Sequence, residues 1–186
     1  MARVLIPLAE GVEEMEAVIL IDVFRRAGWR VDAVGLRDGV VTASRGVKLV
    51  PDVTWSEIDP DGYDVIALPG GNLGTENIMQ DARVLAAVRT QHAAGRWVAA
   101  VCAAPLVLQA AGIIDGKNVT CHPLAADRLT HATRLENTVV VHDRIITSQG
   151  PGTTFVFALA VIAHIEGKEK AREIARGLVI PDAAVE

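Results

Sequence analysis

The chain has 186 residues, of which 51% are hydrophobic and only 4% aromatic, and its 18 Lys and Arg against 23 Asp and Glu give a formal net charge of −5. This length suits one domain of ordinary size and is short for two, and the apolar composition excludes an intrinsically disordered chain. Because the charges form no block of one sign, we expect neither nucleic acid nor a membrane surface as a partner.

Two cysteines, Cys102 and Cys121, cannot form a disulfide framework, and neither has companions at the spacing of a zinc site. We therefore expect no metal and a reducing, cytoplasmic compartment. The 18 uncharged residues from Trp97 to Ile114 reach the lower limit for a membrane span. They include Pro105 and change from β-prone to helix-prone sequence, which predicts two buried elements that meet at Cys102.

Short apolar runs alternate with helical patterns along the chain, as in βαβ units around a parallel sheet. The predicted strands are Arg3–Leu8, Arg30–Gly35, Asp64–Leu68, Trp97–Val101, Asn118–Cys121, Thr138–His142 and Ile145–Ser148. The predicted helices are Met15–Ala27, Asp81–Ala94, Pro105–Ala111, Thr153–Glu166 and Lys168–Arg176, and Val40–Val50 is predicted to be a hairpin appended to the sheet. The sequence thus predicts an α/β fold, a three-layer α/β/α sandwich with a mostly parallel sheet, as a single domain over residues 1–186.

Ligands of such sheets bind at the carboxyl ends of the strands. There the sequence places Cys102, where WVAAV turns into a helix that begins near Pro105. A cysteine in an Ala/Val context is commonly a small buried hydrophobe. Its position at the strand-to-helix turn resembles a nucleophile elbow, and a helix N-terminus lowers a thiol pKa, so a reactive thiol is the competing interpretation.

The acidic loop before the first helix contains Glu13, Glu14 and Glu16, which would stabilise the positive end of the helix dipole. Helical periodicity separates Glu16 from the others, because it shares the apolar stripe with Leu20 and Val23. A carboxyl there is paired or protonated, since burial raises its pKa. Beside a thiol it would suit general acid–base chemistry.

Three further loops are candidates for a place in the site. Gly70 and Gly71 follow a strand, where glycines let backbone N–H groups approach an oxyanion, although such glycines are also ordinary turn residues. His122 is a candidate to orient or deprotonate a thiol, or a structural histidine. The segment SQGPGTT lacks the lysine of a phosphate-binding loop, so we interpret Thr153 as a helix N-cap. No dinucleotide fingerprint occurs, and we expect no cofactor.

Together the motifs GVEEMEAV, LPGGNLG, AAVCAAP, HPLA and SQGPGT resemble, in order and spacing, the DJ-one/ThiJ/PfpI superfamily, from about Val4 to Ile180. The resemblance is greatest to the branch that contains the parkinsonism-associated protein deglycase and its bacterial relatives. It implies a flavodoxin-like fold of the class I glutamine amidotransferase type and a homodimer built largely on the first helix.

The resemblance also implies roles for individual residues. Cys102 would be the nucleophile, Glu16 a buried protonated acid that hydrogen-bonds its sulfur, and His122 a nearby histidine. The residues implied to bind substrate are Gly71 and Ala103, whose N–H groups would face an oxyanion, Asn72 and Glu13 along the pocket, Arg45 at its mouth, and Arg26 from the dimer partner.

Three positions depart from family patterns. The peptidase branch has His after the nucleophile, whereas this chain has Ala103, which disfavours a cysteine peptidase. Val50 stands where animal members have a second cysteine, so redox behaviour of that thiol should not transfer. Cys121 replaces a common threonine, which leaves an auxiliary redox role open.

The function implied is a cofactor-independent enzyme that acts on reactive dicarbonyls or on glycated protein, as a glutathione-independent glyoxalase or protein deglycase in carbonyl and oxidative stress. The competing hypothesis is a redox-sensing chaperone that works through oxidation of Cys102. Both hypotheses require the same thiol, with a pKa well below about 8.5.

Overall fold

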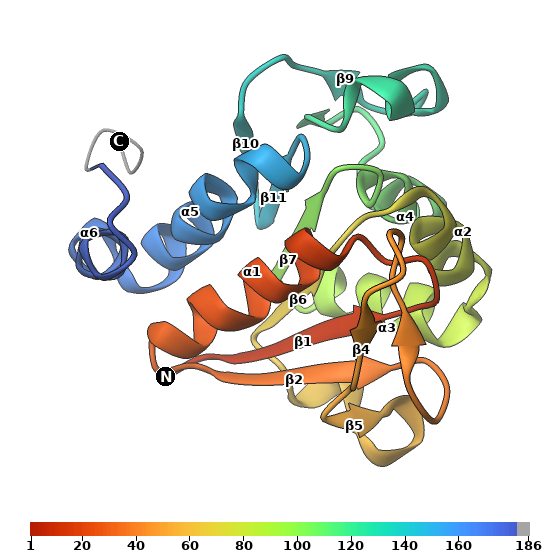
Figure 1. Ribbon diagram of the computed structural model, residues 1–186. Helices are drawn as coiled ribbons and strands as arrows, with labels where there is room; N and C mark the ends of the chain where they lie inside the picture. Colours follow the sequence, from red (N-terminus) through yellow and green to blue (C-terminus); the bar gives the residue numbers. More distant parts are fainter. Residues whose placement is uncertain (182–186) are drawn as a thin grey trace.

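Seven strands form the central sheet, in the order β10-β11-β7-β6-β1-β2-β5 (Figure 1). The computed structural model describes residues 1–181. The strands are β1 (Arg3–Leu8), β2 (Arg30–Gly35), β5 (Val53–Thr54), β6 (Val65–Leu68), β7 (Trp97–Val101), β10 (Val139–His142) and β11 (Ile145–Ser148). All neighbours pair in parallel except β10 and β11, which are antiparallel. The predicted α/β fold with a mostly parallel sheet is confirmed.

Helices cover both faces of this sheet (Figure 1). On one face α1 (Glu14–Arg26) packs beside α5 (Thr154–Glu166), and α6 (Lys168–Gly177) packs on α5. On the other lie α2 (Asn72–Gln80), α3 (Ala82–Ala93) and α4 (Pro105–Ala110). Short 3-10 turns occupy Trp55–Glu57, Pro60–Gly62, Pro123–Arg128 and Pro151–Thr153. Five helices were predicted to within about two residues of their ends.

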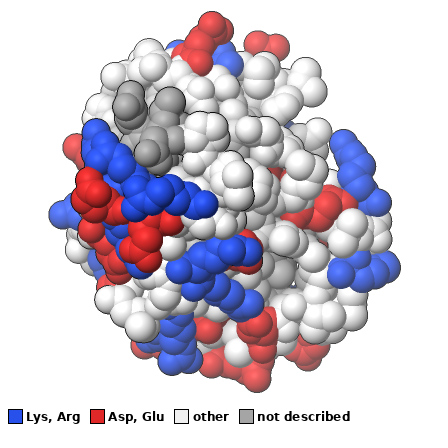
Figure 2. Space-filling view, turned by 60° about the vertical axis from the view of Figure 1, so that its left-hand side comes forward, with Lys and Arg blue, Asp and Glu red and all other residues white. Residues whose placement is uncertain are grey.

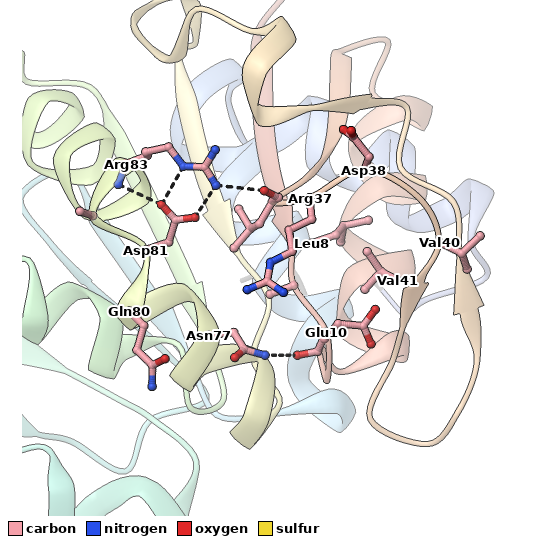
Figure 3. Close-up of a pocket in the computed structure, with 13 residues that line it drawn as sticks. Leu8, Glu10, Arg37, Asp38, Val40, Val41, Asn77, Gln80, Asp81 and Arg83 are labelled. Atoms are coloured by element: carbon pink, nitrogen blue, oxygen red, sulfur yellow. Dashed lines mark hydrogen bonds and ion pairs between the residues drawn. The ribbon is translucent and has the colours of Figure 1, made fainter.

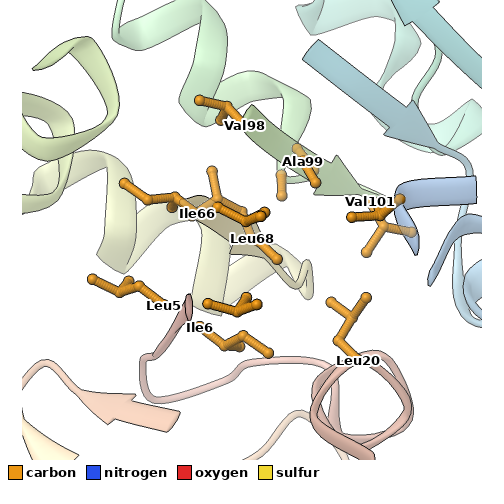
Figure 4. Packing of buried hydrophobic residues seen from close by; sticks show 14 of the residues in the cluster. Leu5, Ile6, Leu20, Ile66, Leu68, Val98, Ala99 and Val101 are labelled. Atoms are coloured by element: carbon orange, nitrogen blue, oxygen red, sulfur yellow. The ribbon is translucent and has the colours of Figure 1, made fainter. Parts of the chain in front are cut away.

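Aliphatic side chains fill the space between the layers (Figure 4). Leu20 of α1 faces the sheet, where Ile6, Leu68 and Val101 of three strands are at most 1% exposed. A parallel sheet covered on both faces needs apolar side chains at nearly every strand position, which explains the unbroken runs in the sequence.

Helix α2 was not predicted. It begins directly after the two glycines, and only Gly74, Thr75 and Ile78 of its residues are buried. Glycine and β-branched residues disfavour an isolated helix, so packing against α3 and α4 stabilises α2 instead.

Two predicted β segments lie outside the main sheet. The strand predicted over Asn118–Cys121 is only β8 (Asn118–Val119), which pairs with β9 (Thr133–Arg134). The predicted hairpin is β3 (Val41–Thr42) with β4 (Lys48–Leu49), a separate two-stranded sheet. Backbone hydrogen bonds from Gly11 N to Thr42 O and from Ser44 N to Val12 O attach it to the loop after β1. The hairpin therefore stands over the carboxyl end of the sheet.

The face shown in Figure 2 carries Lys, Arg, Asp and Glu side by side, so no patch of a single sign dominates it. The longest helices, α1 and α5, have 13 residues each, and among residues 1–181 no helix has the length and apolar character to cross a membrane.

Candidate active site

Cys102 directly follows β7 and has φ of 65°, a conformation that L-residues rarely adopt. Its N–H donates to Ser148 O at 3.0 Å, and its carbonyl accepts from His122 N at 2.8 Å. A non-glycine residue with positive φ costs about 1–3 kcal/mol, which these two hydrogen bonds help the fold to sustain. The turn leaves the residue 9% exposed, at the floor of a cavity.

Glu16 approaches Cys102 from the first turn of α1 and is fully buried. Its Oε2 accepts from Gly70 N at 2.7 Å, while Oε1 is buried without a hydrogen-bond partner that meets normal geometry among residues 1–181. Burial raises the pKa of Glu16 to about 7, although hydrogen bonds from Gly70 and the Cys102 thiol oppose the rise. The carboxyl therefore exchanges its proton near neutral pH, which suits a general acid–base group.

Glycine at position 70 permits this close approach. A Cβ there would lie 2.7 Å from the Cys102 Cβ and 2.9 Å from Glu16 Oε2. The adjacent Gly71 has φ of 90° and packs on the loop after β1, where a Cβ would lie 2.4 Å from Gly11 O. Three strand-end loops thus meet at the thiol.

The N–H groups of Gly71 and Ala103 donate hydrogen bonds to the Cys102 sulfur and lower its pKa. They are outweighed, because burial, followed by the negative charge of the Glu16 carboxylate, raises the pKa of the thiol. This result differs from the expectation that the helix start would lower the thiol pKa. The reason is that burial and the neighbouring acid have a larger effect on the thiol than the backbone N–H groups have.

A cavity of about 520 Å³ opens above the thiol. The residues that line it include six of those predicted from the sequence, namely Cys102, Gly71, Asn72, Glu13, Arg45 and His122. Glu13 also caps α1, since its Oε2 accepts from Glu16 N at 2.8 Å. Glu16 contacts the thiol from α1 without lining the cavity, and Ala103 follows Cys102 in the turn. Arg26, by contrast, is at the opposite end of α1 and pairs with Asp22 at 2.6 Å, outside the cavity of its own chain.

His122 presents a donor to the cavity. Its Nδ1 accepts from Leu124 N at 3.2 Å, so the neutral ring carries its hydrogen on Nε2. A base role toward the thiol is disfavoured by this tautomer, and donation to a substrate oxygen is favoured. Thr153 is the N-cap of α5 by position, but its hydroxyl bonds Gly150 and Ser148 rather than the helix.

Sequence reasoning missed the part played by Glu14. This carboxylate is 7% exposed and accepts from Ser44 Oγ at 2.7 Å and from Arg45 N at 2.8 Å. Hydrogen bonds from Ser44 and from the backbone lower its pKa despite burial. Glu14 thereby holds the hairpin turn that carries Arg45. Nothing in the sequence pattern distinguished it from an ordinary helix-start acid.

Cys121 lies outside this cavity and is fully buried. Its thiol contacts His122 O at 3.4 Å, and burial raises its pKa while the neighbouring Arg134 acts in the opposite direction. Across residues 1–181 no three His, Cys, Asp or Glu side chains are grouped to hold a metal ion.

Cys102 is strained, lies at a strand-to-helix turn, and has backbone N–H groups on its sulfur and a buried carboxyl beside it. These features define an α/β protein with a nucleophile elbow at which the residue is cysteine. The chain belongs to the DJ-1/PfpI family, whose model matches residues 2–164.

The chain is 41% identical to Protein dj-1beta of Drosophila melanogaster, over 95% of this chain and 96% of the relative. It is 35% identical to the protein named glutathione-independent glyoxalase DJR-1.2 of Caenorhabditis elegans, with 96% of each covered. The crystal structure of Drosophila DJ-1beta has a TM-score of 0.93 and 39% identity, covering 97% and 98% of the two chains. That of oxidized Toxoplasma gondii DJ-1 has a TM-score of 0.91 and 38% identity, covering 97% and 99%.

Proposed function

We propose that the protein is a cofactor-independent glyoxalase that converts small 2-oxoaldehydes into 2-hydroxy acids, with Cys102 as the nucleophile. The observation that carries the proposal is the contact of the strained thiol with both a buried acid that titrates near neutrality and two N–H donors. The relative named as a glutathione-independent glyoxalase supports it.

In the first step the Glu16 carboxylate takes the thiol proton while the sulfur attacks the aldehyde carbon of methylglyoxal. Because the raised pKa of Cys102 leaves little free thiolate, this coupled transfer avoids having to form it first. The oxygen of the new hemithioacetal is stabilised by the Gly71 and Ala103 N–H groups and takes up the proton that Glu16 had accepted, which returns Glu16 to its carboxylate form.

In the second step a proton moves from the former aldehyde carbon to the neighbouring carbonyl carbon through an enediol, with Glu16 as the base and then the acid. His122 Nε2–H donates to the second oxygen. The product is a thioester, which water cleaves to lactate and the free thiol, so no external oxidant or reductant is consumed. The same groups acting on glycated side chains would give protein deglycase activity.

Methylglyoxal turnover without glutathione tests the proposal. Wild-type protein is expected to form lactate, and Cys102→Ala to fall to the uncatalysed rate, with Cys121→Ala as the matched thiol control. Equal rates for wild type and Cys102→Ala would refute an enzyme that depends on this thiol.

The pH profile tests the role of Glu16. Since its carboxylate must accept the thiol proton, kcat/KM is expected to rise with pH through about 7, the pKa of Glu16. In Glu16→Gln the rate should drop by about 10²-fold or more and lose this step, whereas Glu169→Gln, on the exposed side of α6, should match wild type. An unchanged profile in Glu16→Gln would exclude Glu16 as the base.

A redox-sensing chaperone is the second candidate, because the same N–H donors would stabilise a Cys102 sulfinate and because a solved relative is described as oxidized. Mild peroxide should then add about 32 Da, two oxygen atoms, at Cys102. Intact-mass analysis that finds no such species would eliminate this candidate.

A further inference from the structure

A second cavity, of about 550 Å³, lies at the carboxyl ends of β1 and β2, beside the junction of α2 and α3 (Figure 3). It is lined by Leu8 at the end of β1 and Glu10 after it, by Arg37 and Val41 after β2, and by Asn77 and other residues of the helix junction. Cys102 does not line it. The carboxyl ends of parallel strands are where α/β proteins bind ligands.

One wall of this cavity is fixed by internal bonds. Arg83 donates to both carboxylate oxygens of Asp81, at 3.0 and 2.6 Å, and to Leu36 O at 2.9 Å. Hydrogen bonding to Arg83 keeps the pKa of Asp81 below its usual value. These two charges satisfy one another and are not available to a ligand.

Of the two arginines in this lining, Arg37 is the one whose charge is not paired among the described residues, and its side chain is exposed. Its guanidinium makes no ion pair or hydrogen bond within residues 1–181, and Figure 3 shows it directed into the space between the Asp81–Arg83 pair and the Asn77–Glu10 hydrogen bond. Asn77 Nδ2 donates to Glu10 O at 2.8 Å and so holds the backbone at this edge. A planar guanidinium without a protein partner is suited to a carboxylate.

The Glu10 carboxylate lies on the same cavity but forms no ion pair with Arg37 in the described chain; one of its oxygens accepts from Thr42 N at 3.1 Å. Opposite charges held apart across a cavity are complementary to a zwitterion. A phosphate dianion is less suited, because Glu10 and the nearby Asp38 would repel it. Val40, which is 52% exposed, supplies an apolar contact for an aliphatic group, while Leu8 and Val41 are nearly buried in the wall behind it.

From these contacts we infer that the cavity is a binding site for a small zwitterion of the α-amino acid class, with its carboxylate on Arg37, its ammonium on Glu10 and its aliphatic side chain against Val40. Glu10 lines both this cavity and the Cys102 cavity, whereas Arg37, Val40 and Asn77 line only this one, and the inference does not depend on the proposed reaction at Cys102.

Titration of the ¹⁵N-labelled full-length protein with L-leucine tests the inference. Leucine is expected to bind in the millimolar range and to shift the amides of Val40, Asn77 and Gln80. 4-Methylpentanoate, which lacks the ammonium, and 3-methylbutylamine, which lacks the carboxylate, should each bind about tenfold more weakly.

Arg37→Ala should weaken leucine binding about tenfold, while Arg176→Ala, an exposed arginine on α6, should leave it unchanged. Arg45→Ala separates the two cavities, since it should also leave leucine binding unchanged. Shifts centred on Gly71 and His122, equal binding by the three probes, or undiminished binding in Arg37→Ala would each overturn the inference. So would the absence of any shift.

Discussion

At the scale of single residues, the site is built from groups in unfavourable environments. Cys102 carries backbone strain, and Glu16 is an acid within an apolar layer. Each of these features alone lowers the stability of the folded state. Side by side, the two groups keep at least one proton at neutral pH, because the loss of both protons would place two negative charges in contact. Function therefore opposes stability at these positions, and the cost should be measurable.

The stability cost of Glu16 depends on pH. The carboxyl has a reference pKa of 4.5 and a folded pKa of about 7. Below pH 4.5 both states are protonated, and between about pH 4.5 and 7 the unfolded state releases its proton first. The free energy of unfolding should therefore fall with rising pH across this window, by about 3 kcal/mol.

Urea unfolding at pH 5 and pH 8 checks this sign. In Glu16→Gln the difference between the two pH values should shrink by about 2–3 kcal/mol relative to wild type. An identical difference in both proteins would contradict a raised pKa for Glu16.

Gly71→Ala tests whether the strand-end loops must touch. The new Cβ would meet Gly11 O at 2.4 Å, at a residue with φ of 90°. Gly28 has a similar φ of 82°, but a Cβ there meets nothing within 4 Å. Gly28→Ala should thus cost about 1–2 kcal/mol from backbone strain alone, and Gly71→Ala clearly more, with loss of activity. Equal melting temperatures for the two variants would show that the close contact is unimportant.

At the scale of elements, the β3–β4 hairpin forms a wall of the Cys102 cavity without joining the main sheet. Backbone hydrogen bonds and the Glu14 carboxylate attach it to the loop after β1 and to the start of α1. The position of Arg45 in the cavity thus depends on an acid that does not line it.

Glu14→Ala should release the turn at Ser44 and Arg45. We expect KM for methylglyoxal to rise several-fold, up to about tenfold, with a smaller change in kcat, because substrate contacts are lost while Cys102 and Glu16 stay in place. Ser44→Ala removes only one of the two hydrogen bonds and should give a smaller effect. A fall in kcat at constant KM would instead place Glu14 in the chemical step.

At the scale of the whole molecule, the outer surface of α1 bears on how copies of the chain assemble. Met15 and Val18 on α1 are 54% and 49% exposed, which leaves apolar side chains on the outer surface of that helix. We expect a homodimer built on α1, as the family resemblance implied, with Arg26 reaching the partner's site.

Light scattering at micromolar concentration should give twice the chain mass of 19.7 kDa. Replacing Val18 by Glu should shift the mass toward the monomer because it puts a charge in the contact, whereas Val179→Glu, far along the chain at an exposed position, should not. A monomer mass for the wild-type protein would reject the dimer.

The sequence by itself determined the alternation of strands and helices, the position of Cys102 at the end of β7 and the burial of Glu16, because all three follow from local hydrophobic periodicity. It also predicted most of the residues around the thiol, because the order and spacing of its motifs resemble those of the family. Helix α2 and the pairing of β8 with β9 were not predicted, since both are stabilised by packing rather than by their own propensity.

Only the tertiary structure decided the rest. Four features depend on which groups lie within a few ångströms of one another. They are the raised pKa of Cys102, the tautomer of His122, the hydrogen bonds from the hairpin turn to Glu14, and an Arg37 guanidinium without a partner in residues 1–181. Electrostatic and hydrogen-bond energies are set by such distances and by burial, and residues distant in sequence acquire those distances only when the chain has folded.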